Sequence, residues 1–535
     1  MAAFEDLPNL LPSPLLVRAE SNGLARTPAA GWNSWNWVGA RVDCDAEPNR
    51  CLNERLMKEM ADALISTGMA AMGYDIVNLS EGWPYKGGRA ANGSLMWDPQ
   101  RFPSGIPALS NYIHSRGLKF GIYLDVGTLT CAKYPGSYGY EEIDAATIVE
   151  WGADYVWMDG CNYPGSVDDF IATYAKWGAL FNSSGRPIIW EASLPAYIPK
   201  KVNLNYISSF SHEWRYYNDI TPSWISIMDI LDYSITNNIF SFARPGQWPL
   251  MDMLEVGNDP LTLSESRTHF SLWAMFAQPL HAGNDIRNMS KELRDIFLNE
   301  EVLAIDRDPL GSAGHLVARF NGSRLADRSV GSCSFWPLAA DPKAHLARLH
   351  PDCVQGAECC DGMRSLERTT MACCGDPSCL GLMMARGAQE RLMGCPLDRK
   401  LCCKRRSNAT AQDVGALAFS ASLDNSSFPS IQTPPVAAAD DKVRVFVKPG
   451  LGLAKADSRG DIYARKLSDA SVAILMLNRG TIPLAMCVGW QDVGLNPFEE
   501  AYVRDVWARA DRGHPYGRYC AEVQPHDVVM LRVQQ

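Results

Sequence analysis

Three acidic residues end short apolar runs at equivalent places in the first 200 residues. Asp125, Asp159 and Glu191 close runs that begin at residues 118, 155 and 187. A carboxylate can act as a nucleophile or general base, and a protonated carboxyl can act as a general acid. A single acid in such a place could equally cap the next helix, but three on successive runs favour one shared cleft.

The elements that would position these acids form a repeated unit of helix, glycine, short buried strand and terminal acid. The unit occurs four times, with strands beginning at residues 74, 118, 155 and 187. The helix of the first unit shows its apolar stripe at intervals of four residues, with Leu52, Leu56, Met60 and Leu64. Short apolar strands that are each reached by a helix indicate parallel pairing. Eight such units close into a barrel whose active site gathers at the carboxyl ends of the strands.

The pattern changes in the second half of the chain. Less regular strands are expected over 214–220, 248–254 and 279–285, and alternating strands such as Val443–Val447, Ser471–Leu477 and Val528–Val533 indicate an antiparallel β domain. We therefore predict an α/β protein with a tail at 1–29, a (β/α)8 TIM barrel at 30–316, and a C-terminal antiparallel β-sandwich at 317–535. A Cys-rich insertion at about 321–440 interrupts the second domain.

Composition narrows the function classes. The 535 residues carry a net charge of -10, are 47% hydrophobic and contain no apolar run long enough to span a membrane. Without a basic face, neither nucleic acid nor an anionic membrane is expected as a partner. The chain has no P-loop, no G-x-S-x-G and no G-x-G-x-x-G after a strand, and no histidine pair with ligand spacing lies near the acids. We expect no cofactor and no metal.

The cysteines point to an oxidising compartment. The chain has 16, ten of them between Cys333 and Cys403, and their even number and clustering suggest disulfides. Zinc is the alternative for the insertion, but it contains no C-x₂-C pair. We expect a secreted or lysosomal/vacuolar glycoprotein, although the N-terminus, with Glu5 and Asp6, does not resemble a signal peptide. Seven N-x-S/T sequons give this expectation only weak support. They are Asn78, Asn92, Asn182, Asn288, Asn321, Asn408 and Asn425.

Aromatic residues are concentrated near the predicted strand ends. Sugars present apolar C–H faces beside hydroxyl groups, so their sites combine flat rings with acids, and glycoside hydrolysis needs two carboxyl groups. The alternative is that these rings are ordinary barrel core. Taken together, the acids and rings favour an acid-driven barrel enzyme with a carbohydrate substrate. The aromatic residues are Trp32, Trp35, Trp83, Tyr123, Trp157, Trp190, Trp214, Tyr216, Tyr217 and Trp248.

Several motifs, in order along the chain, resemble glycoside hydrolase family 27, which contains α-galactosidases and α-N-acetylgalactosaminidases. The resemblance runs from about Gly31 to Gly311 and resumes in Ile474–Gly480 and Val503–Trp507. The motifs are GWNSWN (31–36), WDPQRFPSGI (97–106), GLKFGIYLDVG (117–127), CAKYPGSYGYEEIDA (131–145), WGADYVWMDGC (151–161), WRYYNDI (214–220), MDMLEVGN (251–258) and DPLG (308–311).

The resemblance implies a retaining mechanism on an α-linked galactoside. Asp159 matches the family's nucleophile and Asp219 its acid/base, for which the two carboxyls should lie about 5–5.5 Å apart. Asp219 would have to stay protonated near the working pH, so the resemblance also predicts a raised pKa for this residue.

Further residues match the family's sugar pocket and disulfides. Arg215 matches an arginine that binds the sugar near the acid/base, and Glu191 with Leu194 resembles the galactose-selective pattern, since N-acetylgalactosamine enzymes carry smaller residues there. The other pocket matches are Trp35, Tyr123, Asp252 and Met253. The family's disulfides imply the pairs Cys44 with Cys51 and Cys131 with Cys161.

Three positions depart from the family. Ser80 and Glu81 stand where paired aspartates bind two sugar hydroxyls, and Trp157 replaces a lysine. Loss of a hydrogen bond to a charged group costs roughly 1.5–3 kcal/mol, or about tenfold to a hundredfold in binding. The catalytic pair therefore matches the family, whereas the three departures are expected to change recognition of the sugar.

We thus expect a retaining α-galactosidase-like hydrolase acting on an oligosaccharide or glycoconjugate. A homodimer is the oligomer we consider for it. One alternative is the same fold acting on another glycoside, a β-L-arabinopyranoside or an α-N-acetylgalactosaminide. The other alternative is a non-catalytic carbohydrate-binding homologue.

Overall fold

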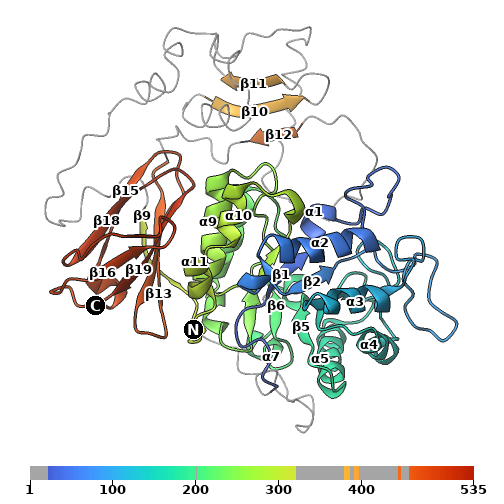
Figure 1. The fold of residues 1–535 in the computed structure, drawn as a ribbon. Helices are drawn as coiled ribbons and strands as arrows, with labels where there is room; N and C mark the ends of the chain where they lie inside the picture. The colour runs from blue at the N-terminus through green and yellow to red at the C-terminus, as the bar shows by residue number, and fades with distance from the viewer. Residues whose placement is uncertain (1–21, 200–201, 321–378, 386–390, 397–443, 448–456) are drawn as a thin grey trace. The chain divides into compact units, whose positions relative to one another are not determined.

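The computed structural model describes residues 22–199, 202–320, 379–385, 391–396, 444–447 and 457–535 (Figure 1). The chain divides into two compact units. The first comprises Met1–Arg319, Gly460–Asn478 and Leu484–Gln535, and the second comprises Phe320–Arg459 and Arg479–Pro483.

An eight-stranded parallel sheet forms the centre of the first unit (Figure 1). The order of its strands is β7-β6-β5-β4-β3-β2-β1-β8. An isolated parallel bridge between Leu254, which follows β7, and Ala282 of β8 joins the two edges. The sheet therefore curls into a TIM barrel, as predicted. The strands are β1 (Ala30–Asn33), β2 (Ile76–Leu79), β3 (Lys119–Asp125), β4 (Tyr155–Asp159), β5 (Ile189–Ala192), β6 (Glu213–Arg215), β7 (Trp248–Leu250) and β8 (Leu280–Ala282).

Helices connect the strands, and several of them begin at a polar side chain that caps the first turn. Asn53 accepts the Leu56 backbone N–H at the start of α2, and reciprocal capping boxes join Ser166 to Asp169 and Thr262 to Glu265. The helices are α1 (Trp35–Val38), α2 (Glu54–Ser66), α3 (Ile106–Ser115), α4 (Glu141–Glu150), α5 (Val167–Ser183), α6 (Leu194–Tyr197), α7 (Leu204–Ile207), α8 (Trp224–Thr236), α9 (Leu263–Met275), α10 (Lys291–Phe297) and α11 (Glu300–Asp306). Short 3-10 turns are η2 (Ala70–Met72), η3 (Ile239–Phe242), η4 (Ile286–Asn288) and η6 (Trp490–Val493).

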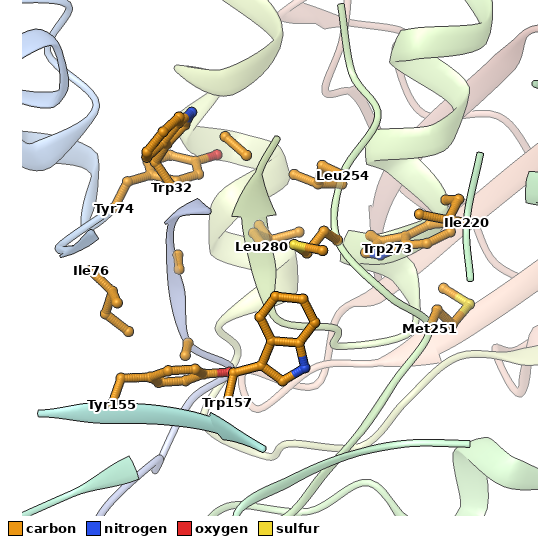
Figure 2. Close-up of a cluster of buried hydrophobic side chains, with 14 of the residues drawn as sticks. Trp32, Tyr74, Ile76, Tyr155, Trp157, Ile220, Met251, Leu254, Trp273 and Leu280 are labelled. Atoms are coloured by element: carbon orange, nitrogen blue, oxygen red, sulfur yellow. The ribbon is translucent and has the colours of Figure 1, made fainter. Parts of the chain in front are cut away.

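The interior of the barrel is packed with side chains (Figure 2). Tyr155 and Trp157 rise from the same face of β4, as alternate residues of a strand must, and Figure 2 shows both beside the apolar cluster that includes Leu280. This packing fixes the strands whose carboxyl ends carry the polar residues described below.

The C-terminal part forms the predicted antiparallel β domain. A six-stranded sheet has the order β17-β16-β19-β14-β13-β9, and β15 pairs separately with β18. The strands are β9 (His315–Phe320), β13 (Gly460–Lys466), β14 (Val472–Asn478), β15 (Leu484–Gly489), β16 (Tyr502–Asp505), β17 (Ala510–Asp511), β18 (Arg518–Val523) and β19 (Val528–Gln534).

One predicted strand lies outside the sheets of the C-terminal domain. The run at 443–447 was predicted in the C-terminal domain, but β12 (Arg444–Val447) pairs with β10 (Cys379–Ala385), which pairs in turn with β11 (Arg391–Pro396). An alternating pattern identifies a strand but not its neighbour, so the assignment was wrong. The insertion's predicted disulfides lie outside what the structure describes, and the predicted domain boundaries stay a prediction.

Three disulfides join described residues: Cys44 with Cys51, Cys131 with Cys161, and Cys487 with Cys520. The third crosses from β15 to β18 and was not anticipated. Among the described helices none combines the length and apolarity needed to cross a bilayer. Of the sequons, Asn78 is buried in β2 and cannot carry a glycan in the folded protein.

Several titratable groups of the first unit are buried, and their shifted pKa values make its stability depend on pH. Burial raises the pKa of Glu255 to about 8, of Asp306 to about 8 and of Glu81 to about 7. Burial also lowers the pKa of His212 to about 4 and of His269 to about 3. The latter histidine must be neutral, because its Nε2 accepts the Glu255 backbone N–H.

We expect the protein to lose stability as the pH rises above neutrality. The folded state retains protons on Glu255 and Asp306 that the unfolded chain releases near its ordinary carboxyl pKa, so the free energy of unfolding falls until those groups ionise near pH 8. The histidines act in the opposite sense only below their ordinary pKa of 6.5. From about pH 7 to about pH 8.5 each group loses about 1.2 kcal/mol, so the loss should be on the order of 2–3 kcal/mol.

The measurement is Tm by calorimetry across this range. Glu255→Gln keeps an oxygen for the amide of Asn258, which donates to Glu255, and should flatten the decline. A Tm that is constant or rises from about pH 7 to about pH 8.5 would contradict this account.

Candidate active site

The strand register brings the predicted acids to one end of the barrel. Asp125 on β3 and Asp159 on β4 are direct partners. Two residues earlier, Trp157 is in register with Tyr123 on one side and with Glu191 on the other. The three acids therefore lie on adjacent strands, with Glu191 level with Trp157 and two residues below Asp125 and Asp159; a cleft shared by all three stays a prediction.

Asp159, the predicted nucleophile, is held through both carboxylate oxygens. The Tyr123 hydroxyl donates to Oδ2 at 3.2 Å, and the Tyr197 hydroxyl donates to Oδ1 at 2.6 Å. The pKa of Asp159 lies above its ordinary value because of burial, and the Tyr197 hydrogen bond and the charge of Arg215 offset part of this rise. These donors and this cation stabilise the ionised form that a nucleophile requires.

Asp219, the predicted acid/base, forms an ion pair with Arg215. Its side chain is 60% exposed, and the guanidinium charge holds its pKa below the ordinary value. The predicted upward shift of this pKa is therefore not present in this structure. The prediction rested on burial and on the charge of Asp159, whereas the guanidinium of Arg215, four residues away, contacts this carboxyl.

Asp252 anchors the other side of the arginine. Its Oδ2 lies 3.3 Å from Arg215 Nη1 and also accepts the Ile220 backbone N–H, while its Oδ1 accepts the Met253 N–H. The Asp252 backbone has a φ of 103°, a strained value for a residue with a side chain. The hydrogen bonds to both carboxylate oxygens offset this strain, which is typical of a functional site.

The two substituted positions after β2 are both buried. Ser80 donates its N–H to Ser34, and its own hydroxyl has no hydrogen-bond partner among the described residues. Glu81 accepts the Ala132 N–H at 2.6 Å. Burial is the largest cause that raises the Glu81 pKa to about 7, with a smaller contribution from the charge of Asp159.

Trp157, the residue in place of the family's lysine, points into the barrel (Figure 2). It is 4% exposed, its ring meets that of Tyr123 edge-on at 5.2 Å, and its Nε1 donates to Ser193 Oγ at 3.3 Å. The indole therefore occupies space at the level of Tyr123 and Glu191.

Below Trp157, a tyrosine joins two buried glutamates. The Tyr155 hydroxyl lies 2.7 Å from an oxygen of Glu191 and 2.7 Å from an oxygen of Glu213. A hydroxyl has one proton to donate, so one of the two carboxyls must itself carry a proton. Burial and the charge of Glu213 raise the pKa of Glu191 well above its ordinary value, which favours Glu191 as the protonated member.

The remaining predicted pocket residues surround this end of the barrel. Leu194 is fully buried at the start of α6, Met253 is buried beside Asp252, and Trp35 is half-buried at the start of α1. The predicted pairs Cys44–Cys51 and Cys131–Cys161 are bonded.

A metal could be considered at Asp125, Cys131 and Cys161, whose ligand atoms lie within 4.8 Å of one another. However, the two sulfurs are bonded to each other and are not thiolates. Asp125 instead accepts the backbone N–H groups of Gly127 and Cys161, which is a structural role.

Two features of the site were missed by the sequence reasoning. Tyr197 lies in no recognised motif, and only its place after the carboxyl end of β5 could have suggested it. Tyr155 and Glu213 read as barrel core, because nothing in the sequence shows that they share a hydroxyl group.

A parallel barrel that presents two carboxylates, a buried arginine and aromatic rings at its carboxyl end, followed by a β domain, defines a glycosidase architecture. The family model described as alpha galactosidase A matches residues 27–308, and that of the alpha galactosidase C-terminal beta sandwich domain matches residues 457–533. The chain belongs to glycoside hydrolase family 27.

Relatives with two different names are about equally similar. Alpha-galactosidase A of Homo sapiens is 39% identical over 327 residues, which are 60% of this chain and 76% of that protein. Alpha-N-acetylgalactosaminidase of Gallus gallus is 40% identical over 310 residues, which are 57% of this chain and 76% of that protein. Overall identity therefore does not choose between the two sugars.

Solved structures share the fold. Alpha-galactosidase I from Mortierella vinacea has a TM-score of 0.64 at 22% identity and covers 96% of this chain and 98% of its own. A family 27 β-L-arabinopyranosidase from Geobacillus stearothermophilus has a TM-score of 0.59 at 17% identity, over 96% of this chain and 98% of its own.

Proposed function

We propose that this protein is a retaining α-galactosidase-like glycosidase in which Asp159 is the nucleophile and Asp219 the acid/base. The observation that carries the proposal is the arrangement around Asp159. Two tyrosine hydroxyls and the charge of Arg215 stabilise a carboxylate that is otherwise disfavoured by burial. The same arginine contacts Asp219 directly.

The reaction proceeds in two displacements. An oxygen of Asp159 forms a bond to the anomeric carbon while the bond to the leaving oxygen breaks, and Asp219 gives its proton to that oxygen. A water molecule then attacks the anomeric carbon, its proton passes to Asp219, and the ester bond to Asp159 breaks. The two steps return both carboxyls to their starting states.

Arg215 determines when Asp219 can act as an acid. In the free protein the ion pair favours the ionised form of Asp219, which has no proton to donate. When a sugar hydroxyl binds the guanidinium, the pair loosens and the carboxyl becomes easier to protonate. Substrate binding and acid catalysis are coupled in this way through one side chain.

We propose galactose rather than N-acetylgalactosamine as the sugar, on the basis of the resemblance at two positions. Glu191 and Leu194 are both large and both buried at the carboxyl end of β5 and the start of α6. Smaller residues at these positions would be needed to admit an acetamido group. This local feature supports the galactoside where overall identity does not decide.

A second candidate is the same chemistry on another glycoside, such as a β-L-arabinopyranoside. It rests on Trp157, whose indole fills space inside the barrel, and on Ser80, whose hydroxyl lacks a partner among the described residues. Both changes alter the part of the pocket that holds the sugar hydroxyls while leaving Asp159 and Asp219 in place.

The setting we propose is an oxidising compartment, outside the cell or in a lysosome or vacuole, because disulfides persist there. The proposed substrate is an oligosaccharide or glycoconjugate. A homodimer stays a prediction.

The first test is the initial rate of the full chain on nitrophenyl glycosides. The panel is α-galactoside, α-N-acetylgalactosaminide, β-L-arabinopyranoside and α-glucoside. We expect hydrolysis of the α-galactoside, and we expect Asp159→Ala to lower the rate by at least about a thousandfold because the covalent route is lost. The matched control is Asp168→Ala, in an exposed residue of α5, which should retain the full rate.

Each outcome of the panel has a definite meaning. Activity confined to another sugar would support the second candidate and overturn the galactoside assignment. Equal rates for Asp159→Ala and the unmodified chain would show that the nucleophile is misassigned. No turnover of any of the four glycosides would favour a carbohydrate-binding protein.

The second test restores the family's polar groups in the pocket. Trp157→Lys combined with Ser80→Asp should raise kcat/KM for the α-galactoside by about tenfold or more, since hydrogen bonds to charged groups are regained. Trp157→Phe is the control, because it reduces the bulk without adding a charge. An unchanged or lower kcat/KM in the double variant, with Tm preserved, would refute our account of these substitutions.

A further inference from the structure

Tyr197 is the closest hydrogen-bond donor to Asp159 among the described residues. Its hydroxyl lies 2.6 Å from Oδ1, whereas the Tyr123 hydroxyl lies 3.2 Å from Oδ2 and is also 3.4 Å from Asp125. Tyr123 therefore divides its single proton between two carboxylates. The contact from Tyr197 is shorter.

The surroundings of Tyr197 leave Asp159 as its best acceptor. The hydroxyl lies 3.3 Å from the Cys161 sulfur and 3.5 Å from the Cys131 sulfur, but disulfide sulfur is a weak acceptor compared with a carboxylate. The ring packs edge-on against Phe170 at 6.1 Å. Packing on one side and the disulfide on another aim the hydroxyl at Oδ1.

The position of Tyr197 also connects it to the sugar pocket. It is the last residue of α6, the four-residue helix that begins at Leu194. Its side chain is 38% exposed, so it lies where the carboxyl end of the barrel opens to solvent. One short helix thus carries both a predicted sugar-binding residue and a donor to the predicted nucleophile.

The electrostatic need for such a donor is clear. Burial disfavours the ionised form of Asp159, and the charge of Asp219 adds to this effect. Hydrogen bonds from Tyr197 and Tyr123 and the charge of Arg215 act in the opposite direction. The titratable groups that act on Asp159 are Glu81 after β2, Tyr123 and Asp125 on β3, Tyr174 on α5, Tyr197 on α6, Arg215 on β6 and Asp219 after β6.

We propose that Tyr197 is a positioning residue that orients Asp159 for attack on the anomeric carbon and favours its ionised form through the 2.6 Å hydrogen bond to Oδ1, an inference that rests on the proposed role of Asp159. Its hydroxyl keeps Oδ1 in place while the carboxylate is free. It stabilises the same carboxylate again when the ester bond breaks in the second displacement. Removal of the hydroxyl should therefore affect catalysis more than substrate binding.

The test is Tyr197→Phe, which deletes the hydroxyl and keeps the ring against Phe170. We expect kcat to fall by about tenfold or more with KM changed less than about twofold, because a charge-assisted hydrogen bond is lost. We also expect the acidic limb of the pH profile of kcat/KM to move upward by about one pH unit, because the carboxylate becomes easier to protonate. A merely structural role would not move this limb.

The control is Tyr138→Phe, in a tyrosine of similar exposure (41%) that packs edge-on against Tyr163. It should leave kcat, KM and the acidic limb unchanged. If Tyr197→Phe leaves the acidic limb of the pH profile in place, the proposal is overturned. A faster reaction would also overturn it, because the Tyr197 hydroxyl would then hinder the attack by Asp159. Asp159→Ala is measured in parallel: if that variant stays active, it is the proposed function that fails rather than the role of Tyr197.

Discussion

The arrangement of the site depends on one buried cation among several carboxylates. Arg215 is 8% exposed and contacts both Asp219 and Asp252, and its charge also acts on Asp159 and Glu191. Burying several acids together would raise all of their pKa values and leave them protonated. The guanidinium offsets this most strongly for Asp219, whose pKa is lowered, whereas the pKa values of Asp159, Glu191 and Asp252 remain raised.

The barrel supplies the rigidity that this balance requires. The site carboxylates come from different strands and loops, and the parallel register fixes their relative height. Backbone strain at Asp252 is tolerated because its side chain is bonded to two N–H groups and to Arg215. A strained residue with this many partners has little freedom to move, which keeps the arginine in place.

The sequence predicted what depends on periodicity and on motifs. The repeated strand, the carboxyl-end acids and the antiparallel domain follow from apolar spacing, and the placement of Asp159 followed from its strand. What sequence reasoning missed depends on three-dimensional neighbours. The partner of β12, the short contact from Tyr197 and the hydroxyl shared by Glu191 and Glu213 link segments whose proximity no local pattern encodes. The direction of the Asp219 pKa shift was wrong for a different reason: Arg215 is close in sequence, but its spacing did not show that its guanidinium contacts this carboxyl.

The central claim is that Asp159 forms a covalent bond to the sugar, and trapping that bond tests it most directly. The protein is incubated with an activated 2-deoxy-2,2-difluoro-α-galactoside, digested, and the labelled peptide is sequenced by mass spectrometry. The account predicts one fluorogalactosyl ester per chain, located on Asp159. A label on another residue, or hydrolysis of α-galactosides with inversion at the anomeric carbon and no label, would contradict it.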